Sequence, residues 1–418
     1  MSLERQIEDL ARATRDASRV VASLSTTQKN AWLARAAERL EAGKEAILEA
    51  NQRDIRAATE KGLAKPLVRR LDLGGGKWET MIDGLRQVAA LPDPVGEVSD
   101  MRVRPNGLRV GRMRIPLGVI AIIYESRTNV TVDAAALCLK AGNGVILRGG
   151  SEAFHANQAL GQELRAALAD VGIPQDAISV VPTTDRAAID HFLKLDDCID
   201  LVIPRGGKAL VRKVKAESTI PVIAHDEGVC HVFLDATADA EMATRIVIDS
   251  KLRQMAVCNG LETLLCHEAA AERLLPTVLK ALYEEGVEVR GCARTCELFA
   301  DAVSAASADW AAEYLDRIVA VRVVPDLDEA IRHVQEYGSD HTDVIVTSDY
   351  ANSQEWLRRV NSSTVGINCS TAFSDGYRLG LGAEIGISTS KLHSFGPMGL
   401  EELTTRKFIL YGDGQLGE

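Results

Sequence analysis

Apolar residues recur every three or four positions through the first 95 residues, the spacing that places side chains on one face of a helix. Three stretches show it well: QIEDLARATRDASRVVASL, TQKNAWLARAAERL and KEAILEANQRDIRAA. A fourth, LGGGKWETMIDGLRQVAAL, begins with a glycine turn, and Pro92 and Pro94 prevent its helix from continuing. The pattern predicts an all-helical start to the chain.

Beyond residue 116 the pattern changes to short apolar runs that alternate with amphipathic segments. Buried strands separated by helices are typical of a parallel sheet covered on both faces, so we predict an α/β fold. The first series comprises strands at 118–124, 144–148, 178–181, 199–203 and 221–223, and helices near 131–141, 154–170, 185–195 and 206–216. The second comprises strands at 230–234, 261–265, 287–290, 318–323 and 343–347, and helices at 238–250, 268–285 and 326–337. Two α/β domains are therefore expected to join near residue 224.

A polar hairpin is predicted before the first series, in SDMRVRPNGLRVGRMRIP. Asn106 and Gly107 separate two runs of alternating apolar and basic residues, and both residues tolerate the positive φ of a tight turn. We expect the hairpin to project from its domain and to pair with another subunit; a surface hairpin without a partner fits the local sequence equally well. The segment TRKFILYGDG at 405–414 is the expected companion strand across the subunit boundary.

Composition narrows the class of protein. A chain of 418 residues is too long for one simple core, and its net charge of −11 argues against nucleic acid or an anionic membrane as partner. The longest apolar run, IPLGVIAIIY, is far shorter than the roughly 20 residues that span a bilayer, and no secretory signal is visible, so we expect a cytoplasmic protein. The eight cysteines form no CxxC pair, which predicts reduced thiols and no metal site.

Four glycine-rich turns in the chain are candidates for binding phosphate groups. No GxGxxG fingerprint follows an expected strand, and the glycines at 380–386 and 73–78 are interpreted as ordinary turns. LRGGSEA at 147–153 and IPRGGKAL at 203–210 each follow a strand of the first series and open a helix. Their amides would face the carboxyl edge of the sheet, where ligands bind in open α/β folds, although each is also a plain strand–helix turn.

Cys258 lies in QMAVCNGLETLL, between an expected helix and an apolar strand. Free cysteine is most often an inert packing residue, and the local pattern alone favours that interpretation. The alternative is a nucleophile, because Lys251 and Arg253 precede it and nearby cations lower the pKa of a thiol.

Longer blocks of sequence favour the interpretation of Cys258 as a nucleophile. VCNGLET resembles the nucleophile segment of the aldehyde dehydrogenase superfamily. The blocks IPLGVIAIIYESRTNVTVDAAALCLKAGNGVILRGG, HDEGVCHVFLD and GLGAEIGISTSKLHSFGPMGLEELTT resemble one branch of it, the glutamate-5-semialdehyde dehydrogenases or gamma-glutamyl phosphate reductases. The resemblance covers nearly the whole chain. Thr128 and Gly260 depart from the branch, which more often has proline and alanine there, and neither is a reacting group.

The resemblance implies an aldehyde dehydrogenase-like α/β fold with two domains built on parallel-rich sheets and a small β oligomerisation element. The implied ranges are 1–97 and 116–223 for the cofactor-binding domain, 224–395 for the catalytic domain, and 98–115 and 396–418 for the oligomerisation element. The implied reaction is NADPH-dependent reduction of L-glutamate 5-phosphate to L-glutamate 5-semialdehyde and phosphate, through a thioester on Cys258, in L-proline biosynthesis. It also implies a homo-oligomer, at least a dimer, and transient contact with glutamate 5-kinase, which makes the substrate.

The same resemblance assigns roles to particular residues. The backbone N–H of Cys258 and the side-chain amide of Asn129 would stabilise the oxyanion, although Asn129 also suits a helix cap. Arg148 would favour the 2′-phosphate of NADP(H), because a guanidinium matches phosphate geometry. Glu313 would hold the nicotinamide ribose; a solvated helix-end carboxylate is the alternative. The remaining expected contacts are Gly149 and Gly150 at the adenosine ribose, Arg205, Gly206 and Gly207 near the pyrophosphate or nicotinamide, and Glu125, Arg127 and Lys391 at the charged groups of the substrate.

One difference from hydrolytic aldehyde dehydrogenases is informative. Those enzymes carry a water-activating glutamate in an E-L-G-G segment, which here resembles AHDEGVCH, with His225 or Asp226 nearest to the position. A missing base suits phosphate as the leaving group, because no hydrolytic water is needed. Glu227, one or two residues out of register, keeps a non-phosphorylating or CoA-acylating aldehyde dehydrogenase as an alternative. A catalytically inactive structural homologue is the third hypothesis, which the intact VCNGLET segment disfavours.

Overall fold

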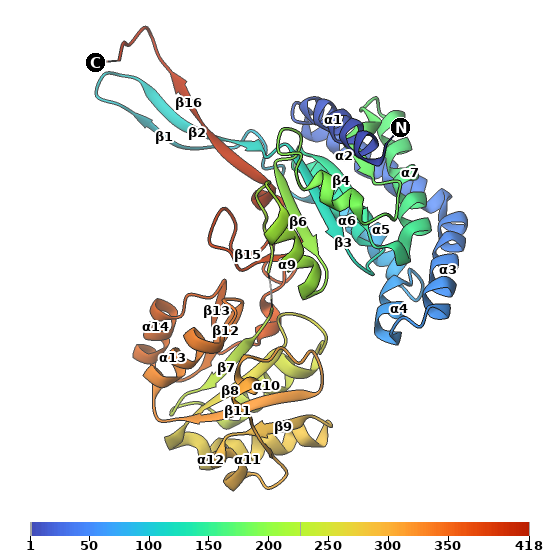
Figure 1. Cartoon of the computed structure of the whole chain (residues 1–418). Coiled ribbons are helices and arrows are strands. Elements are labelled where there is room, and N and C mark those ends of the chain that lie inside the picture. Colours follow the sequence, from blue (N-terminus) through green and yellow to red (C-terminus); the bar gives the residue numbers. More distant parts are fainter. Residues whose placement is uncertain (1, 226, 418) are drawn as a thin grey trace. The chain divides into compact units, whose positions relative to one another are not determined.

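The computed structural model describes residues 2–225 and 227–417, which form two compact units (Figure 1). The first unit runs through Ala224 and includes Gly380–Gly386 and the residues from Met398 onward; the second comprises His225–Leu379 and Ile387–Pro397. The sequence placed 380–386 in the catalytic domain. In the structure this segment belongs to the first unit, because Ile385 packs in its core and donates its N–H to the carbonyl of Met398 at 2.9 Å.

The first unit begins with helices, as the apolar spacing predicts. They are α1 (Leu3–Val21), α2 (Thr26–Ala42), α3 (Lys44–Glu60), α4 (Lys65–Leu71) and α5 (Lys77–Ala90). The side chain of Ser2 caps α1, and Ser25 and Gln28 form a reciprocal capping box at the start of α2. Among the described residues, no helix is both long and apolar enough to cross a membrane.

The first unit contains a parallel sheet in the order β5-β4-β3-β6. Its strands are β3 (Val119–Tyr124), β4 (Gly144–Gly149), β5 (Ile178–Val180) and β6 (Leu201–Arg205). The helices between and after them are α6 (Val130–Lys140), α7 (Phe154–Asp170), α8 (Ala187–Phe192) and α9 (Lys208–Glu217). Every residue of β3 is buried, as expected for a strand covered on both faces. The strand predicted at 221–223 is wrong, because Val222 makes only a single bridge to Val202.

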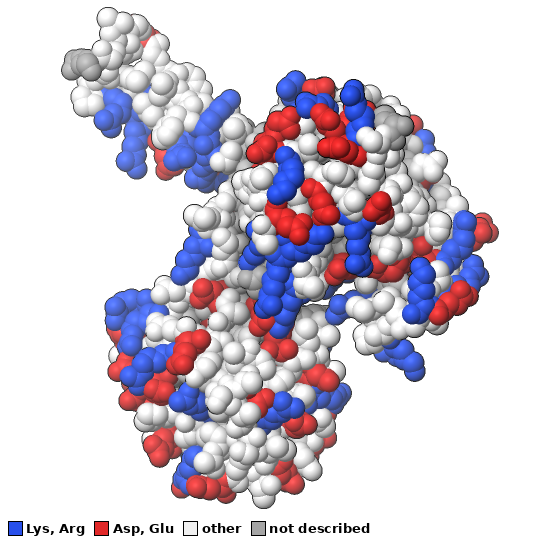
Figure 2. Space-filling model, viewed as in Figure 1, with Lys and Arg blue, Asp and Glu red and all other residues white. Residues whose placement is uncertain are grey.

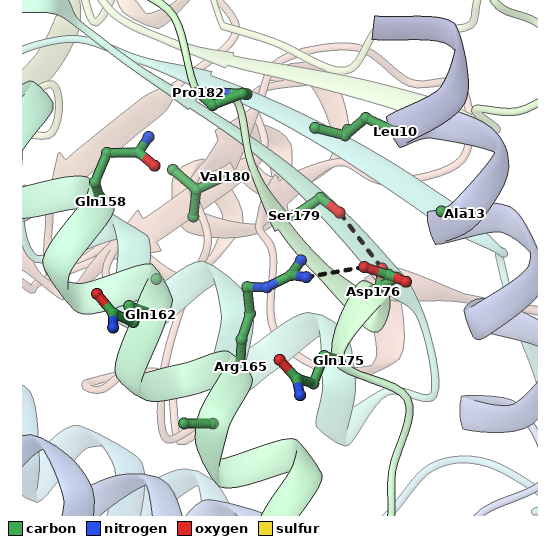
Figure 3. Close-up of a pocket in the computed structure, with 12 residues that line it drawn as sticks. Leu10, Ala13, Gln158, Gln162, Arg165, Gln175, Asp176, Ser179, Val180 and Pro182 are labelled. Atoms are coloured by element: carbon green, nitrogen blue, oxygen red, sulfur yellow. Dashed lines mark hydrogen bonds and ion pairs between the residues drawn. The ribbon is translucent and has the colours of Figure 1, made fainter. Parts of the chain in front are cut away.

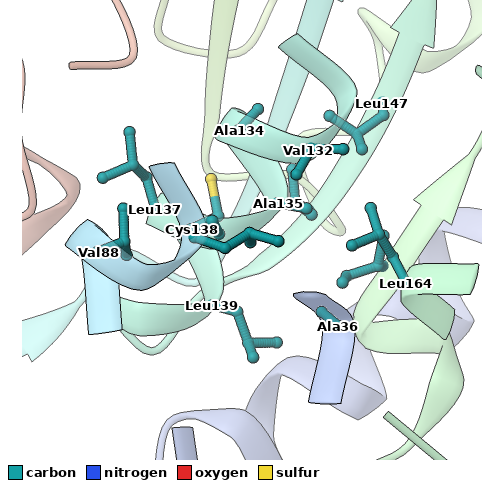
Figure 4. Packing of buried hydrophobic residues seen from close by; sticks show 14 of the residues in the cluster. Ala36, Val88, Val132, Ala134, Ala135, Leu137, Cys138, Leu139, Leu147 and Leu164 are labelled. Carbon is teal, nitrogen blue, oxygen red and sulfur yellow. The ribbon is translucent and has the colours of Figure 1, made fainter. Parts of the chain in front are cut away.

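Helix α6 lies in the main core of this unit, and every residue of it except Asp133 is buried. Its small alanines allow close approach of the neighbouring elements, as Figure 4 shows. Around it lie Ala36 of α2, Val88 of α5 and Leu164 of α7. Cys138 of α6 is part of this core, and burial raises the pKa of its thiol far above the usual range, so it is an inert packing cysteine.

The predicted hairpin forms, and its third strand comes from the same chain. Strands β1 (Val98–Val103), β2 (Arg109–Pro116) and β16 (Thr404–Tyr411) make an antiparallel sheet, hereafter the arm (Figure 1). The full length of β16 pairs with β2, so the pairing expected across a subunit boundary is wrong. The turn uses positive φ only at Gly107, whose N–H donates to the carbonyl of Arg104 at 2.9 Å. Figure 2 shows basic side chains along the arm.

The second unit is built on a parallel sheet in the order β10-β9-β11-β8-β7-β12-β13. Its strands are β7 (Cys230–Leu234), β8 (Leu261–His267), β9 (Glu288–Gly291), β10 (Val303–Ser304), β11 (Ile318–Val324), β12 (Thr342–Val346) and β13 (Thr364–Ile367). Its helices are α10 (Ala240–Leu252), α11 (Glu268–Glu284), α12 (Ala293–Leu298), α13 (Leu327–Tyr337) and α14 (Tyr350–Arg359). The predicted strands and helices of this series are confirmed, and α12, β10, α14 and β13 are additional. A short pair, β14 (Ile387–Ser388) and β15 (Gly396–Pro397), completes the unit.

Candidate active site

Three strand–helix turns lie at the carboxyl edge of the first sheet, after the adjacent strands β4, β3 and β6. Two carboxylates join them. Glu152 accepts hydrogen bonds from the backbone N–H of Ser126 at 2.6 Å and from its hydroxyl at 2.9 Å, and Glu125 accepts from the N–H of Gly207 at 2.9 Å. Ser126 has a φ of 47°, a strained value for a non-glycine residue, so Glu152 holds it in an unfavourable conformation. The three turns form one cluster where open α/β sheets bind ligands.

The glycines of this cluster leave room for the joining side chains. A Cβ at Gly149 would lie 2.0 Å from Nδ2 of Asn157, one at Gly150 2.2 Å from Oε1 of Glu152, and one at Gly206 2.4 Å from Oε2 of Glu125. Each glycine is therefore needed so that a polar side chain can pack on its backbone. Gly207 has space, because its Cβ would meet only Glu125, at 3.9 Å.

Arg148 joins the turn after β4 to the loop that follows β5. It is 7% exposed, and its guanidinium donates to the carbonyls of Gly149 at 3.1 Å and of Thr184 at 3.2 Å. Burial lowers the pKa of Arg148, and the nearby Glu152 charge opposes that effect. Its Nε has no hydrogen-bond partner within the described part of the chain. A buried donor remains available at the turn cluster, which fits a bound polar ligand.

Asn129 stands at the N-terminus of α6 but does not cap it, so the helix-cap interpretation is wrong. Its backbone is already helical, and its side-chain Nδ2 donates instead to Oδ2 of Asp133 at 2.8 Å. Removal of the Asp133 carboxyl from water raises its pKa to about 6, and the Asn129 hydrogen bond and the Arg205 charge oppose the rise. Arg205 in turn lies against Gly386, where a Cβ would be 3.0 Å from its guanidinium. Asn129, Asp133 and Arg205 are thus one electrostatically coupled group.

Cys258 lies in the turn between α10 and β8, at the amino edge of the second sheet. It is partly exposed, as are Cys292, Cys296 and Cys369, whereas Cys138, Cys198, Cys230 and Cys266 are buried. Exposure therefore does not single out Cys258, and its role as nucleophile stays a prediction. The turn is tight: the N–H of Gly260 donates to the carbonyl of Val257 at 3.2 Å. The side-chain amide of Asn259 anchors it by donating to the carbonyl of Ser374 at 2.9 Å. Cys258 therefore sits on a fixed turn, and the residue is partly exposed.

Gly228 packs directly on the backbone of Cys258. A Cβ at Gly228 would lie 2.0 Å from the carbonyl oxygen of Cys258 and 2.7 Å from its Cα. The N–H of Gly228 donates to Oε1 of Glu313 at 2.8 Å. Glu313 is half-buried in the loop before β11, so its interpretation as a solvated helix-end carboxylate is wrong. The structure brings Cys258, Gly228 and Glu313 together as consecutive contacts.

A second thiol contacts the same turn. Sγ of Cys230 donates to the carbonyl of Cys258 at 3.2 Å and lies 3.6 Å from Nδ1 of His341. Burial raises the pKa of Cys230 well above its usual value, so the thiol keeps the proton it donates. Burial lowers the pKa of His341 to about 3, and its ring meets that of His225 edge-on at 6.2 Å. His225 is half-buried, and Asp226, the other residue near the position of the water-activating glutamate, lies outside the described residues.

The cations expected to activate Cys258 are engaged with carboxylates instead. Nζ of Lys251 pairs with Oε2 of Glu262 at 2.8 Å, and both side chains are buried. Arg253 pairs with Asp249 at 2.6 Å. Burial raises the pKa of Glu262 to about 7, with the Lys251 charge opposing it, and burial lowers the pKa of Lys251. Neither cation is thus a dedicated partner of the thiol.

The residues expected at the charged groups of the substrate come from both units. Glu125 and Arg127 belong to the turn after β3 in the first unit, where Glu125 is engaged with Gly207. Lys391 belongs to the second unit, in the exposed loop between β14 and β15, with its Nζ 5.6 Å from the centre of the Phe395 ring. Their substrate roles stay predictions.

A pocket of about 630 Å³ lies in the first unit, along β5 and between α1 and α7 (Figure 3). Its polar wall includes Arg165, which donates to Asp176 at 2.9 Å and to the carbonyl of Ile178 at 2.9 Å. The described residues that line it include none of the expected site residues.

Comparison with known proteins identifies the family. The model of the aldehyde dehydrogenase family matches residues 2–290. Gamma-glutamyl phosphate reductases from Geotalea daltonii and Geobacter metallireducens are 56% and 54% identical to the chain, over the whole of both sequences in each case. The crystal structure of gamma-glutamyl phosphate reductase from Thermotoga maritima is 42% identical, with a TM-score of 0.97, and the match covers 99% of this chain and 100% of that one. The chain belongs to the gamma-glutamyl phosphate reductases of the aldehyde dehydrogenase family.

The predicted fold class and the resemblance are both confirmed by these matches. Within a gamma-glutamyl phosphate reductase, the described contacts add residues that sequence reasoning missed: Gly228, Cys230, Asp133 and Glu262. All four lie inside quoted blocks: Gly228 and Cys230 in HDEGVCHVFLD, Glu262 in VCNGLET, and Asp133 in the block that begins IPLGVIAIIYESRTNVTVD. The signal was therefore present as sequence but without a partner to explain it. A charged residue in an otherwise apolar strand, such as Glu262 in LETLL, is the kind of signal that predicts a buried pair.

Proposed function

We propose that this gamma-glutamyl phosphate reductase reduces L-glutamate 5-phosphate to L-glutamate 5-semialdehyde with NADPH, through a thioester on Cys258. The observation that carries the proposal is the turn of Cys258, a partly exposed residue whose backbone packs on Gly228, which in turn donates its N–H to Glu313. Its family membership at 56% identity supports the substrate. The semialdehyde is the product that L-proline biosynthesis requires, and we propose that the enzyme acts in the cytoplasm.

The proposed steps use sulfur because a thiolate is a strong nucleophile and a good leaving group. Cys258 attacks the acyl carbon, the carbon–oxygen bond to phosphate breaks, and inorganic phosphate leaves with the bonding electrons. A backbone N–H at Cys258 and the amide of Asn129 stabilise the oxyanion of each tetrahedral stage. After reduction of the thioester carbonyl, collapse of the thiohemiacetal expels the Cys258 thiolate and releases the aldehyde.

The first unit is proposed to bind the cofactor. The turn cluster fits a dinucleotide, because it lies at the carboxyl edge of a parallel sheet and Arg148 keeps a buried Nε without a partner among the described residues. When bound, the nicotinamide supplies the hydride. Arg148, Gly149 and Gly150 would hold the adenosine ribose and its 2′-phosphate. Arg205, Gly206 and Gly207 would hold the pyrophosphate or nicotinamide, and Glu313 the nicotinamide ribose.

The arm is proposed to serve homo-oligomerisation. Its strands expose Val103 at 70%, Phe408 at 66% and Leu410 at 63%, an unusual apolar content for a sheet with basic side chains. Exposed apolar strands of this kind are normally covered by a partner. A second copy of the chain is the proposed partner, and transient contact with glutamate 5-kinase is proposed for substrate transfer.

The test is NADP⁺ reduction with the semialdehyde as substrate, measured with and without phosphate, for the wild type and for Cys258→Ser. The proposed enzyme requires phosphate, because the reverse reaction ends in phosphorolysis of the thioester. Activity without phosphate, or activity that needs coenzyme A instead, would support the alternative aldehyde dehydrogenases. Full activity in Cys258→Ser would exclude the thioester.

A further inference from the structure

Lys251 and Glu262 form a buried ion pair beside the nucleophile turn. Their side chains are 1% and 0% exposed, and Nζ of Lys251 lies 2.8 Å from Oε2 of Glu262. A buried pair is seldom retained for stability, because desolvation of two charges offsets much of their attraction and an apolar pair can replace it. Lys251 ends α10 before Cys258, and Glu262 follows Cys258 in β8. The pair therefore connects the two ends of the segment that carries the thiol.

A β-bulge aims Glu262 out of the regular strand. Cys230 pairs with Leu261 and His231 with Thr263, so Glu262 is the extra residue on β8 between two consecutive positions of β7. Bulges redirect a side chain from the ordinary alternation of a strand, and they are common beside active sites. Here the redirected carboxylate reaches Lys251 with one oxygen and leaves the other for a second partner.

That second partner is the loop that carries Glu313. Oε1 of Glu262 accepts a hydrogen bond from the backbone N–H of Leu315 at 3.1 Å. Leu315 has a φ of 52°, which is rare for a branched residue and costs conformational free energy. The hydrogen bond from Glu262 holds the loop in this conformation. Glu313, two residues earlier, then accepts from the N–H of Gly228, which packs on the carbonyl of Cys258.

We propose that Lys251 and Glu262 are a positioning pair that acts through Glu313. The pair sets the conformation of the 313–315 loop. The loop in turn sets the placement of the Glu313 carboxylate and, through Gly228, the position of the Cys258 backbone. The inference rests on the proposed function in one respect, that Glu313 contacts the cofactor. Lys251 fixes the direction of the Glu262 carboxylate, and Glu262 transmits it to the loop. Neither residue needs to touch substrate or cofactor.

The test compares this pair with a matched pair in the first unit. Lys29 and Asp93 are 0% and 7% exposed and 2.9 Å apart, and Asp93 also accepts from a backbone N–H, that of Val95, at 3.0 Å. The double variants are Lys251→Met with Glu262→Leu, and Lys29→Met with Asp93→Leu. For each, the dissociation constant of NADPH is measured by fluorescence, and the rate at which iodoacetamide alkylates Cys258 by mass spectrometry, beside the melting temperature.

We expect the first variant to weaken NADPH binding by about 10-fold and to change the alkylation rate by at least about 5-fold, whereas the control lowers only the melting temperature. Glu262→Gln keeps an acceptor for the Leu315 N–H and should lie closer to the wild type than Glu262→Leu. If the double variant does not fold, Glu262→Gln replaces it in the same measurements. Equal effects of the two double variants on binding and alkylation would overturn the proposal.

A double-mutant cycle with Glu313→Ala tests the route of the effect. If Glu262 acts through Glu313, Glu262→Leu weakens NADPH binding in the wild-type background but changes it by less than about 2-fold in the Glu313→Ala background. Additive effects would assign Glu262 to general stability and overturn the proposal. Failure of the proposed function is separable: wild type that binds no NADPH or turns over no substrate contradicts that function, while the alkylation rates of Cys258 still decide whether the pair positions the thiol.

Discussion

Replacement of Gly228 by alanine is the sharpest perturbation that the structure suggests at the nucleophile. The φ of Gly228 is not in the left-handed region, so alanine suits its backbone and the change acts only through the added methyl group. That methyl would meet the carbonyl oxygen of Cys258 at 2.0 Å and its carbonyl carbon and Cα at 2.7 Å. All three are backbone atoms, which cannot rotate away as the end of a side chain can.

The size of the effect follows from those distances. Contacts of a Cβ below 3.0 Å do not occur in practice, so Gly228 and the Cys258 turn must separate by at least about 1 Å. A misplacement of about 1 Å at a reacting group costs about 100-fold in rate, or about 2.7 kcal/mol of transition-state stabilisation. Crowding of a packed region also costs about 1–3 kcal/mol of stability. We therefore expect Gly228→Ala to lower kcat/KM about 100-fold.

Stability loss alone must be separated from misplacement of the thiol. Gly291→Ala is the control, because its Cβ would crowd Thr295 at 2.7 Å in the same unit but at β9, away from the Cys258 turn. The assay is phosphate-dependent NADP⁺ reduction by the semialdehyde, beside the melting temperature of each variant. If Gly228→Ala keeps kcat/KM within about 3-fold of the wild type while both variants lose similar stability, the packing of the Cys258 backbone on Gly228 does not control the reactivity of the thiol. That result would refute the prediction.

Three further predictions concern other parts of the molecule. Asn129→Ala should lower kcat by about 10²–10³-fold with little change in melting temperature; unchanged kcat would limit Asn129 to its hydrogen bond with Asp133. Arg148→Ala should raise the KM for NADPH by about 10-fold or more but that for NADH by less than about 2-fold, whereas equal rises would assign Arg148 to joining the turn after β4 to the loop after β5. Burial lowers the pKa of His333 to about 2, below its unfolded value near 6.5, so the unfolded chain gains a proton that the folded chain does not; stability is complete above about pH 6.5 and falls below it. Between pH 7.5 and 5.5 this histidine should remove about 1.4 kcal/mol, and urea titrations of His333→Phe should show a pH dependence smaller by that amount.

The local pattern of apolar residues predicted most of the fold, because the pattern within a short segment indicates which of its residues are buried. The run VIAIIY can only be a strand covered on both faces, and it is β3. The short PVI at 221–223 lacked that length, and it forms a single bridge. The partner of the hairpin could not be found in the same way, because β16 is separated from β2 by almost 290 residues and nothing in TRKFILY states whether it pairs within or between chains.

The site residues also differ in whether their partners could be predicted from nearby sequence. Arg253 has its partner Asp249 four residues earlier on one helix face, and this pairing could be read from spacing. The partner of Lys251 could not, because Glu262 lies beyond the Cys258 turn and reaches Lys251 only through a bulge. The thiol itself was identified by resemblance rather than by any local signal. The contacts of its backbone, to Gly228 and to Cys230, come from a segment that precedes it by some thirty residues.

Those contacts explain why the two blocks HDEGVCH and VCNGLET come together at one site. Strands β7 and β8 are parallel neighbours joined by α10, so their first residues lie at the same edge of the sheet. The start of β7 supplies Gly228 and the thiol of Cys230 to the carbonyl of Cys258, and the start of β8 supplies Glu262 to the loop of Glu313. These contacts fix the backbone of Cys258. Substitutions at these distant residues should therefore alter the reactivity of Cys258 without touching the sulfur.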